Sequence, residues 1–173
     1  MKYWYMFPCG VTEKNVGDAI IGIFGQYQKD SSVEVTLYIS STGGDIDSAI
    51  RFYDFIKSSK VNLKTVGFGQ VDSAAVILLL SSKERTLIKD CRVRLHQLSY
   101  TGAQQSQVLS IHLETTSLLQ NLDKRYFEIM SFELGMEEAK VRDLLEKGCI
   151  LNIDEATNLK IATKSANELP VER

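Results

Sequence analysis

The chain has 173 residues, of which 44% are hydrophobic and 24% charged, and its net charge is −2. These values are typical of one globular domain with a real core, and the near-neutral charge gives no electrostatic case for binding nucleic acid or an anionic membrane. Three scattered cysteines and two histidines lack ligand spacing, so we expect reduced thiols in the cytoplasm, no metal and no other cofactor. The N-terminus has no signal-peptide pattern, and the apolar runs are too short to span a bilayer.

The first clear strand of the sequence leads into a pair of glycines. Residues 33–40, "VEVTLYIS", alternate apolar and polar side chains as a strand does. "STGG" follows, and apolar residues then recur at helical spacing from Ile46 to Ile56. Glycines at such a turn let backbone N–H groups approach an anion, as an oxyanion hole requires, although a plain tight turn gives the same pattern.

A second strand and helix contain a lone serine. Residues 61–69 form the predicted strand, and "SAAVILLLSS", residues 73–82, is apolar on every side, which indicates a buried helix. The position of Ser73 at the start of this helix has two interpretations. Either Ser73 or Asp72 caps the helix by accepting a backbone N–H, or Ser73 is a nucleophile.

A third, short strand in "CRVRLHQ", residues 91–97, carries His96 on the face opposite its apolar side chains. Alternating strands and helices imply right-handed crossovers and a mainly parallel sheet, whose strand carboxyl ends share one crevice. The Gly43–Gly44 turn, Ser73 and His96 all follow predicted strand ends. We therefore predict that they meet there, in an arrangement suited to acyl transfer.

The second half of the chain begins with a long predicted helix from about Gln104 to Leu134, ended by Gly135. It carries more apolar residues than one small domain could bury along a protruding helix. The remaining apolar surface favours an interface and hence a homo-oligomer. We interpret His112, within this helix, as a surface or interface residue rather than a base.

The C-terminal part contains short elements only. A helix over residues 136–147 ends at Gly148, and a strand-like "CIL" follows. A brief helix then begins with Asn152 as its cap and Glu155 at the capping-box position. No linker or internal repeat interrupts the chain, so we expect a single domain.

Three motifs in order resemble the ClpP family, the proteolytic subunits of the ATP-dependent Clp protease: "YISSTGGDIDSAIRFYDFIKSS", "TVGFGQVDSAA" and "RVRLHQ". The family patterns run roughly Y-I-N-S-P-G-G, G-Q-A-A-S-M-G-A and R-V-M-I-H-Q-P, and the interval from Gly44 to Ser73 fits without a gap. The resemblance covers about residues 5–162. It implies an α/β fold of the ClpP/crotonase type, built of repeated β-β-α units with a protruding handle helix. The single domain, 1–173, would comprise a head at about 1–100, a handle at 104–134 and further head elements at 136–173.

The resemblance also implies a function. Ser73 would be the nucleophile of a serine-type endopeptidase and His96 its general base, and the backbone N–H groups of Gly44 and Ala74 would hold the oxyanion. Substrates would be peptides or unfolded polypeptides, cleaved inside a homo-oligomeric ring that works with an AAA+ unfoldase.

The sequence departs from the family pattern at several positions. Gly148 stands where the family keeps its catalytic Asp. Either Ser73 and His96 work as a dyad, or a substitute acceptor comes from Asn152, Asp154 or a backbone carbonyl. Thr42 stands in place of a proline, and Asp72 in place of a small residue. The sequence begins almost at the family's first core strand, so we expect no docking segment for the unfoldase.

Three functions remain open from the sequence. The first is a ClpP-like peptidase, weak or specialised, that uses Ser73 and His96. The second is a non-catalytic ring subunit related to ClpP. The third, which ranks last because it needs no Ser–His pair, is an acyl-CoA site of the crotonase kind.

Overall fold

The computed structural model describes residues 1–99 and 109–170, with the backbone alone for residues 109–113. Strands and helices alternate along most of the chain, in the order β1 (Lys2–Phe7), α1 (Glu13–Lys29), β2 (Glu34–Ser41), α2 (Ile46–Ser58), β3 (Asn62–Asp72), α3 (Ala75–Leu80), β4 (Glu84–Ile88), β5 (Arg92–Leu95), α4 (Leu109–Leu134), α5 (Glu138–Lys147), β6 (Cys149–Leu151), α6 (Ile153–Asn158) and β7 (Lys164–Ala166).

The sheet is mainly parallel, as the alternation of elements predicts. Strands β1, β2, β3, β4 and β7 lie in that order, and every neighbouring pair among them is parallel. Strand β3 is long enough to serve two partners. Its first half pairs with β4, and its last residues pair with β5, which then pairs antiparallel with β6. The end of β3 therefore lies beside the end of β5.

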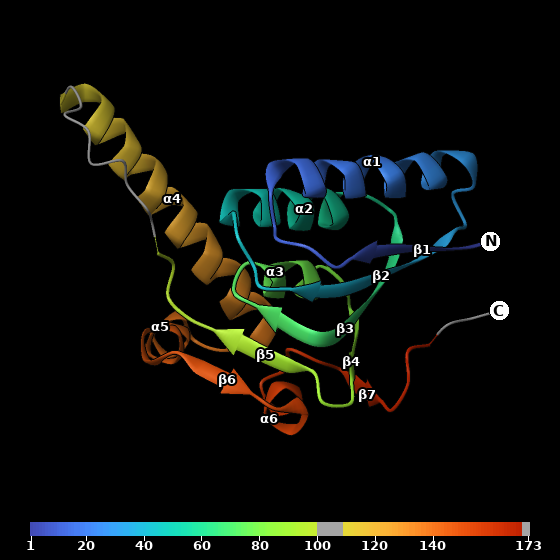
Figure 1. Cartoon of the computed structure of the whole chain (residues 1–173). Helices are drawn as coiled ribbons and strands as arrows, with labels where there is room; N and C mark the ends of the chain where they lie inside the picture. The colour runs from blue at the N-terminus through green and yellow to red at the C-terminus, as the bar shows by residue number, and fades with distance from the viewer. Residues whose placement is uncertain (100–108, 171–173) are drawn as a thin grey trace.

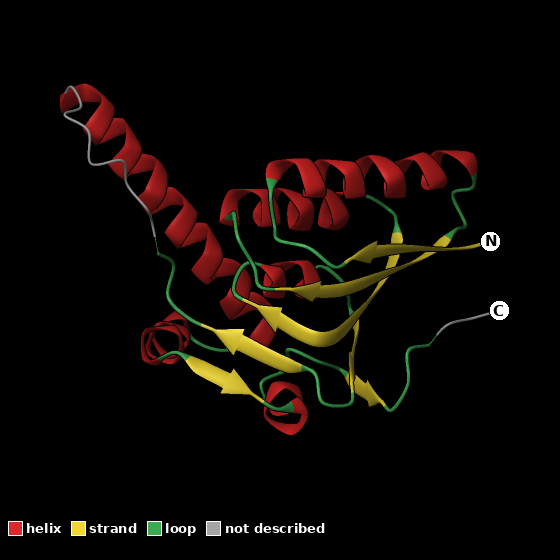
Figure 2. Cartoon of the chain, in the orientation of Figure 1, coloured by secondary structure: helices red, strands yellow, loops and turns green. Residues whose placement is uncertain are grey.

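The helices α1, α2 and α3 form a layer over one face of the sheet (Figure 1), and Figure 2 shows the same layering by element type. Helix α3 is the centre of the core, because all six of its residues are buried. It packs against β3 and α2, which leaves it no face toward solvent. The prediction of a buried helix after Ser73 is confirmed.

Helix α4 extends away from the sheet as a handle (Figure 1). Near its C-terminal end Tyr126, Phe127, Ile129 and Met130 are buried against the head, whereas Leu118 is 58% exposed. The predicted start at Gln104 lies outside the described residues, as does the side chain of His112. The predicted end is confirmed: Gly135 has φ 64°, and the next N–H, that of Met136, donates to the carbonyl of Ser131 at 3.1 Å.

A buried carboxylate fixes the base of this handle to the head. Glu133 of α4 is 7% exposed and forms ion pairs with Arg85 at 2.9 Å and Lys57 at 2.8 Å. The hydroxyl of Tyr53 also donates to it at 2.7 Å. Three side chains from two head elements, α2 and β4, thus hold one helix through a single carboxylate. None of the described helices combines the length and apolar character needed to cross a membrane.

Candidate functional site

Ser73 occupies a sharp turn between β3 and α3. Its backbone has φ 57°, a left-handed conformation that is rare for residues other than glycine. Its N–H donates to the carbonyl of Arg94 at 2.8 Å, and its carbonyl accepts from the N–H of Val76 at 2.9 Å. The turn is thus held on both sides by backbone hydrogen bonds, while the Ser73 side chain remains partly exposed.

The interpretation of Ser73 or Asp72 as a helix cap is wrong. The residue at the N-cap of α3 is Ala74, and no side chain caps this helix. The physical reason is the left-handed turn: Ser73 lies one residue before the N-cap, so its hydroxyl is not directed at the free N–H groups of the first turn. Within the described part of the chain, the Ser73 hydroxyl makes no hydrogen bond.

The Gly43–Gly44 turn packs directly onto Ser73. A β-carbon placed on Gly43 would lie 2.7 Å from Cβ of Ser73, closer than real β-carbons approach, and 3.1 Å from the backbone N of Ala74, a tight contact. Gly43 and Gly44 also have φ 87° and 145°, which other residues rarely adopt. The turn therefore requires glycine both for its conformation and for its contact with the serine.

Two backbone N–H groups are free beside this contact. Gly44 forms an isolated parallel bridge with Val11, in which Val11 donates to Gly43 and accepts from Asp45. This bridge does not use the N–H of Gly44, which faces away from Val11. Among the described residues, neither this N–H nor that of Ala74 has a hydrogen-bond partner, so both are available to an oxyanion.

His96 follows the end of β5, beside the end of β3. Asp72 pairs with Arg94, so Ser73 and His96 lie one and two residues beyond the last register pair of these strands. The imidazole is partly exposed, and its Nδ1 lies 2.6 Å from the carbonyl oxygen of Gln97. A carbonyl can only accept, so Nδ1 carries the proton in this contact and Nε2 is left as a base. No hydrogen bond joins Ser73 and His96 in the described part of the chain.

Gly148 terminates α5 close to this histidine. It has φ 62° and ψ 140° at the C-cap, so its role as a helix-ending residue with positive φ is confirmed. A β-carbon placed there would lie 3.7 Å from the carbonyl oxygen of Leu95, an ordinary contact one residue before His96. A carboxylate at this position would thus start near the base, but the backbone there is one that glycine strongly prefers.

Asn152 and Asp154 are not close to His96 along the paired strands. Strand β6 runs antiparallel to β5 with Leu151 opposite Val93, so Asn152 lies level with Arg92, near the other end of β5. The side chain of Asn152 accepts from the N–H of Glu155 at 3.0 Å, which forms the predicted capping box, and Asp154 is exposed. This geometry favours the Gln97 carbonyl over both residues as the orienting acceptor.

Asp72 is a buried charge that the sequence pattern does not explain. It is 4% exposed. One carboxylate oxygen lies 3.4 Å from Arg92, and the other has no hydrogen-bond partner among the described residues. Burial, and to a smaller extent Asp72, raises the pKa of the nearby Cys91 thiol to about 12. Cys91 is therefore protonated at neutral pH and is not a nucleophile.

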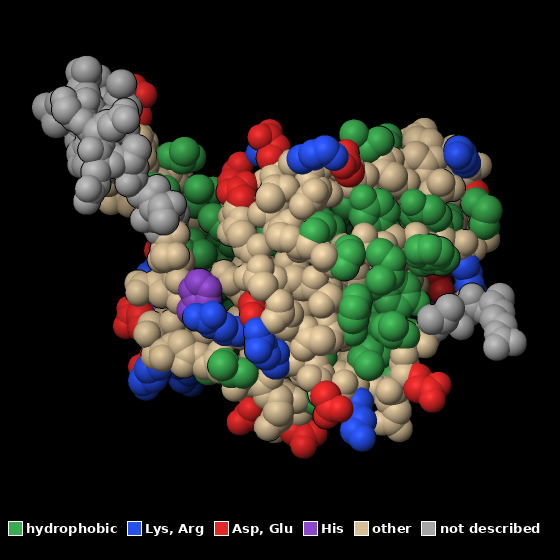
Figure 3. Space-filling model, in the orientation of Figure 1, with side chains coloured by type: hydrophobic (Ala, Val, Ile, Leu, Met, Phe, Trp, Pro, Cys, Tyr) green, Lys and Arg blue, Asp and Glu red, His purple; other side chains and the backbone are tan. Residues whose placement is uncertain are grey.

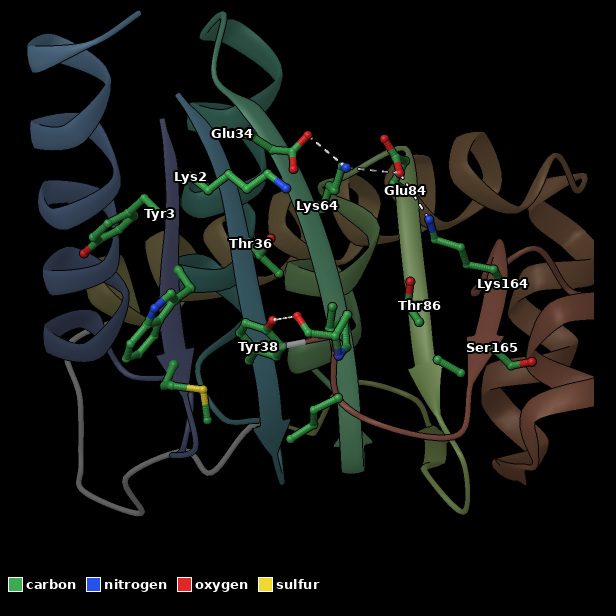
Figure 4. Close-up of a pocket in the computed structure, with 16 residues that line it drawn as sticks. Lys2, Tyr3, Glu34, Thr36, Tyr38, Lys64, Glu84, Thr86, Lys164 and Ser165 are labelled. Carbon is green, nitrogen blue, oxygen red and sulfur yellow. Dashed lines mark hydrogen bonds and ion pairs between the residues drawn. The ribbon is translucent and has the colours of Figure 1, made fainter. Parts of the chain in front are cut away.

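A large hollow lies elsewhere, on the open face of the sheet. This open-face groove has a volume of about 800 Å³ and is lined by side chains of β1, β2, β3, β4 and β7, with Leu169 and Pro170 at one end. Ion pairs join Lys64 to Glu34 and Lys164 to Glu84 across the strands (Figure 4). Figure 3 shows hydrophobic side chains gathered on the side where β1 lies. The groove contains none of the candidate catalytic residues, and no group of three or more potential metal ligands occurs in residues 1–99 and 114–170.

Comparison with known proteins gives a consistent set of relatives. The chain is 25% identical over 148 residues to ATP-dependent Clp protease proteolytic subunit 2 of Frankia casuarinae, covering 84% of this chain and 67% of that protein. It is 26% identical to subunit 2 of Mycobacterium leprae, covering 87% and 71%. For subunit 2 of Corynebacterium jeikeium the identity is 30%, over 73% of this chain and 61% of the relative.

The fold and the family agree with these matches. A mutant of ClpP1 from Listeria monocytogenes superposes with a TM-score of 0.82 at 18% identity, over 95% of this chain and 91% of that one, which shows the ClpP/crotonase-like fold. The family model described as Clp protease matches residues 6–164. The chain is therefore a divergent, ClpP-like member of the Clp protease family.

Proposed function

We propose that the protein is a serine-type peptidase in which Ser73 is the nucleophile and His96 the general base. The observation that carries this proposal is the turn at Ser73: a non-glycine residue at φ 57°, in contact with a Gly-Gly turn and beside the strand that leads to His96. A left-handed residue costs about 1–3 kcal/mol, and such strain is found mainly where a site requires it. Asp90 and Lys160 also have positive φ, but only Ser73 of these three combines it with contact to the Gly-Gly turn and a position beside the strand that leads to His96.

The proposed reaction proceeds in two steps. Ser73 Oγ attacks the peptide carbonyl carbon while Nε2 of His96 accepts the hydroxyl proton. The N–H groups of Gly44 and Ala74 donate to the resulting oxyanion. His96 then protonates the leaving amine nitrogen, and the acyl-enzyme remains. Water, deprotonated by His96, then attacks the acyl carbon. The acyl C–Oγ bond breaks while His96 returns the proton to Ser73 Oγ, which releases the acid and regenerates the serine.

The Gln97 carbonyl supports a reduced rate rather than a full one. It keeps the proton on Nδ1, which is the tautomer that the reaction needs, but a neutral carbonyl stabilises the imidazolium less than a carboxylate does. Loss of the acid in a triad protease costs on the order of 10⁴ in rate. We therefore expect slow turnover of short peptides and no degradation of folded proteins.

The direct test is a fluorophosphonate probe applied to the native protein. Labelling of the wild type, absent in Ser73→Ala and reduced in His96→Ala, supports the peptidase, and hydrolysis of a fluorogenic peptide should follow the same order. An unlabelled wild type with a normally cooperative unfolding transition would refute the nucleophile.

The second candidate is a non-catalytic ring subunit, which Gly148 favours because it places no acid where the family resemblance puts one. If the protein is a non-catalytic subunit, neither the wild type nor Gly148→Asp should react with the probe. In both cases we propose that the protein is cytoplasmic and assembles as a homo-oligomeric ring with an AAA+ unfoldase as its partner.

A further inference from the structure

We propose that Ser41 is a positioning residue whose buried hydroxyl, with the backbone of Val11, fixes the direction of the Gly44 N–H. This inference rests on the proposed function, since it concerns the oxyanion turn of the same site. Ser41 does not touch the reacting atoms. It acts through the Gly43–Gly44 turn.

Ser41 stands out because it interrupts a buried apolar row. Val35, Leu37 and Ile39 of β2 are all 0% exposed, and Ser41, two residues further, is 2% exposed. A hydroxyl at such a depth costs free energy unless it forms a hydrogen bond. Its recorded partner is the N–H of Gly43, at 3.1 Å. The polar residue in an apolar row thus serves the glycine turn.

The peptide unit between Gly43 and Gly44 shows what is being held. A trans peptide is planar, with its C=O and N–H pointing in opposite directions. The carbonyl of Gly43 accepts from the N–H of Val11 at 2.9 Å, so the N–H of Gly44 must point away from Val11. On the other side of Gly44, the N–H of Asp45 donates to the carbonyl of Val11 at 2.8 Å. Val11 therefore sets the direction of this one peptide plane.

Ser41 restrains the preceding peptide unit, the one between Thr42 and Gly43. Gly43 and Gly44 have no β-carbons, so rotation about their backbone bonds costs little and the turn needs restraint from outside. Thr42, just before them, stands where the family resemblance places a proline, whose ring would fix φ. The hydrogen bond from Gly43 to Ser41 restrains the turn at this point. Together, Ser41 and Val11 hold both peptide units that precede the free N–H.

Three variants distinguish a positioning role of Ser41 from a general effect on folding stability. Ser41→Ala removes the acceptor, and Ser41→Thr keeps it. Ser82→Ala removes another buried hydroxyl, 3% exposed, whose bond goes to the carbonyl of Leu63 far from the turn. Removing an oxyanion donor lowers kcat by about 10²–10³-fold. We therefore expect a Gly44 N–H that points in the wrong direction to lower kcat by at least about tenfold.

The kinetic expectation is specific. Ser41→Ala should lower kcat for a short peptide by about tenfold or more and leave KM within about twofold of the wild type. It should also weaken the binding of a peptide boronate by a similar factor, because the tetrahedral boronate adduct needs the oxyanion donors. Ser41→Thr should restore most of kcat. A Ser41→Ala protein with the kcat of Ser82→Ala would overturn the proposal.

A second readout does not depend on catalysis. In protein labelled with ¹⁵N-glycine, the Gly43 amide should exchange with solvent faster in Ser41→Ala than in the wild type or Ser82→Ala, and the Gly44 amide resonance should shift. If the wild type neither turns over peptide nor binds the probe, the proposed peptidase fails, yet these amides still decide the role of Ser41. Unchanged exchange at Gly43 in Ser41→Ala would refute it.

Discussion

The backbone of Ser73 carries strain that a change of residue can relieve. Glycine adopts φ 57° without a steric penalty, whereas alanine keeps the penalty and loses only the hydroxyl. We expect Ser73→Gly to be more stable than Ser73→Ala by about 1 kcal/mol in urea unfolding, although both are inactive. Asp90→Gly, at an exposed turn with φ 65°, is the positive control. Equal stability of the two Ser73 variants would show that the turn is unstrained.

Gly148→Asp tests whether the missing acid limits the rate. The new β-carbon would lie 3.7 Å from the Leu95 carbonyl oxygen, an ordinary contact, and the carboxylate should raise kcat if it reaches Nδ1 of His96 in place of Gln97. The φ and ψ of Gly148 make the change cost about 1–3 kcal/mol of stability. Gly148→Ala shares the backbone cost without the charge. If both variants turn over peptide equally, the acid is not what limits the enzyme.

At the scale of the elements, the attachment of α4 to the head depends on one buried residue, Glu133. Removing Glu133 leaves Arg85, itself 7% exposed along its side chain, without its partner. Because an unpaired buried charge is costly, we expect Glu133→Ala to lower the free energy of unfolding by about 3–5 kcal/mol. Arg85→Met combined with Glu133→Leu should lose less than either single change. Asp143→Ala, which breaks an exposed pair with Lys147, is the control and should alter stability little.

The buried thiol of Cys91, just before β5, should make the protein less stable at alkaline pH. The pKa of Cys91 is raised from its ordinary value of 9.0 to about 12, so the folded protein keeps a proton that the unfolded chain releases between these values. The free energy of unfolding should therefore fall as pH rises from about 9 to about 12. Burial and the Glu133 carboxylate raise the pKa of Tyr53 in the same direction.

Cys91→Ala removes one part of this dependence. Chemical unfolding measured at about pH 8 and about pH 11 should show a smaller loss in Cys91→Ala than in the wild type. Cys9→Ala, at a less buried thiol, should behave more like the wild type. A Cys91→Ala protein with the full wild-type loss would contradict the shifted pKa.

The elements with strong periodicity could be predicted, and those held by tertiary packing could not. The core strand β2, the buried helix α3 and the end of α4 at Gly135 follow from apolar spacing and turn residues. Helix α1 does not, because Gly17, Gly22 and Gly25 weaken its pattern, and its stability comes from packing on the sheet.

The candidate residues of the site could be named from the sequence, whereas the geometry around them could not. The Gly-Gly turn, Ser73 and His96 follow strand ends, which a parallel sheet brings to one edge. The left-handed backbone of Ser73, the bridge from Val11 and the Gln97 carbonyl opposite Nδ1 depend on contacts between distant segments. Sequence spacing records none of them. The proposed role of Ser41 has one signal in the sequence, a hydroxyl in an otherwise apolar row of β2.

At the scale of the whole molecule, we expect assembly through the handle. The stretch of α4 from Glu114 to Leu118 is exposed, and the apolar Leu118 has no packing partner that buries it in the described part of the chain. Light scattering at micromolar concentration should therefore give a mass several times that of one chain. Leu118→Lys should reduce this mass, whereas Ser117→Lys, which adds the same charge next to it, should reduce it less. A monomeric wild type would rule the assembly out.

The bridge between Val11 and Gly44 has a consequence for how the protein folds. The candidate site draws on four segments: the loop after β1, the end of β2, the end of β3 and the end of β5. Parallel pairing between strands so far apart in sequence is slow, because chain closure must precede the contacts that reward it. During synthesis, the serine emerges before the histidine and cannot have its base until β5 has joined β3. Under the proposed function, a nascent chain would therefore have no hydrolytic capacity until β5 has paired with β3.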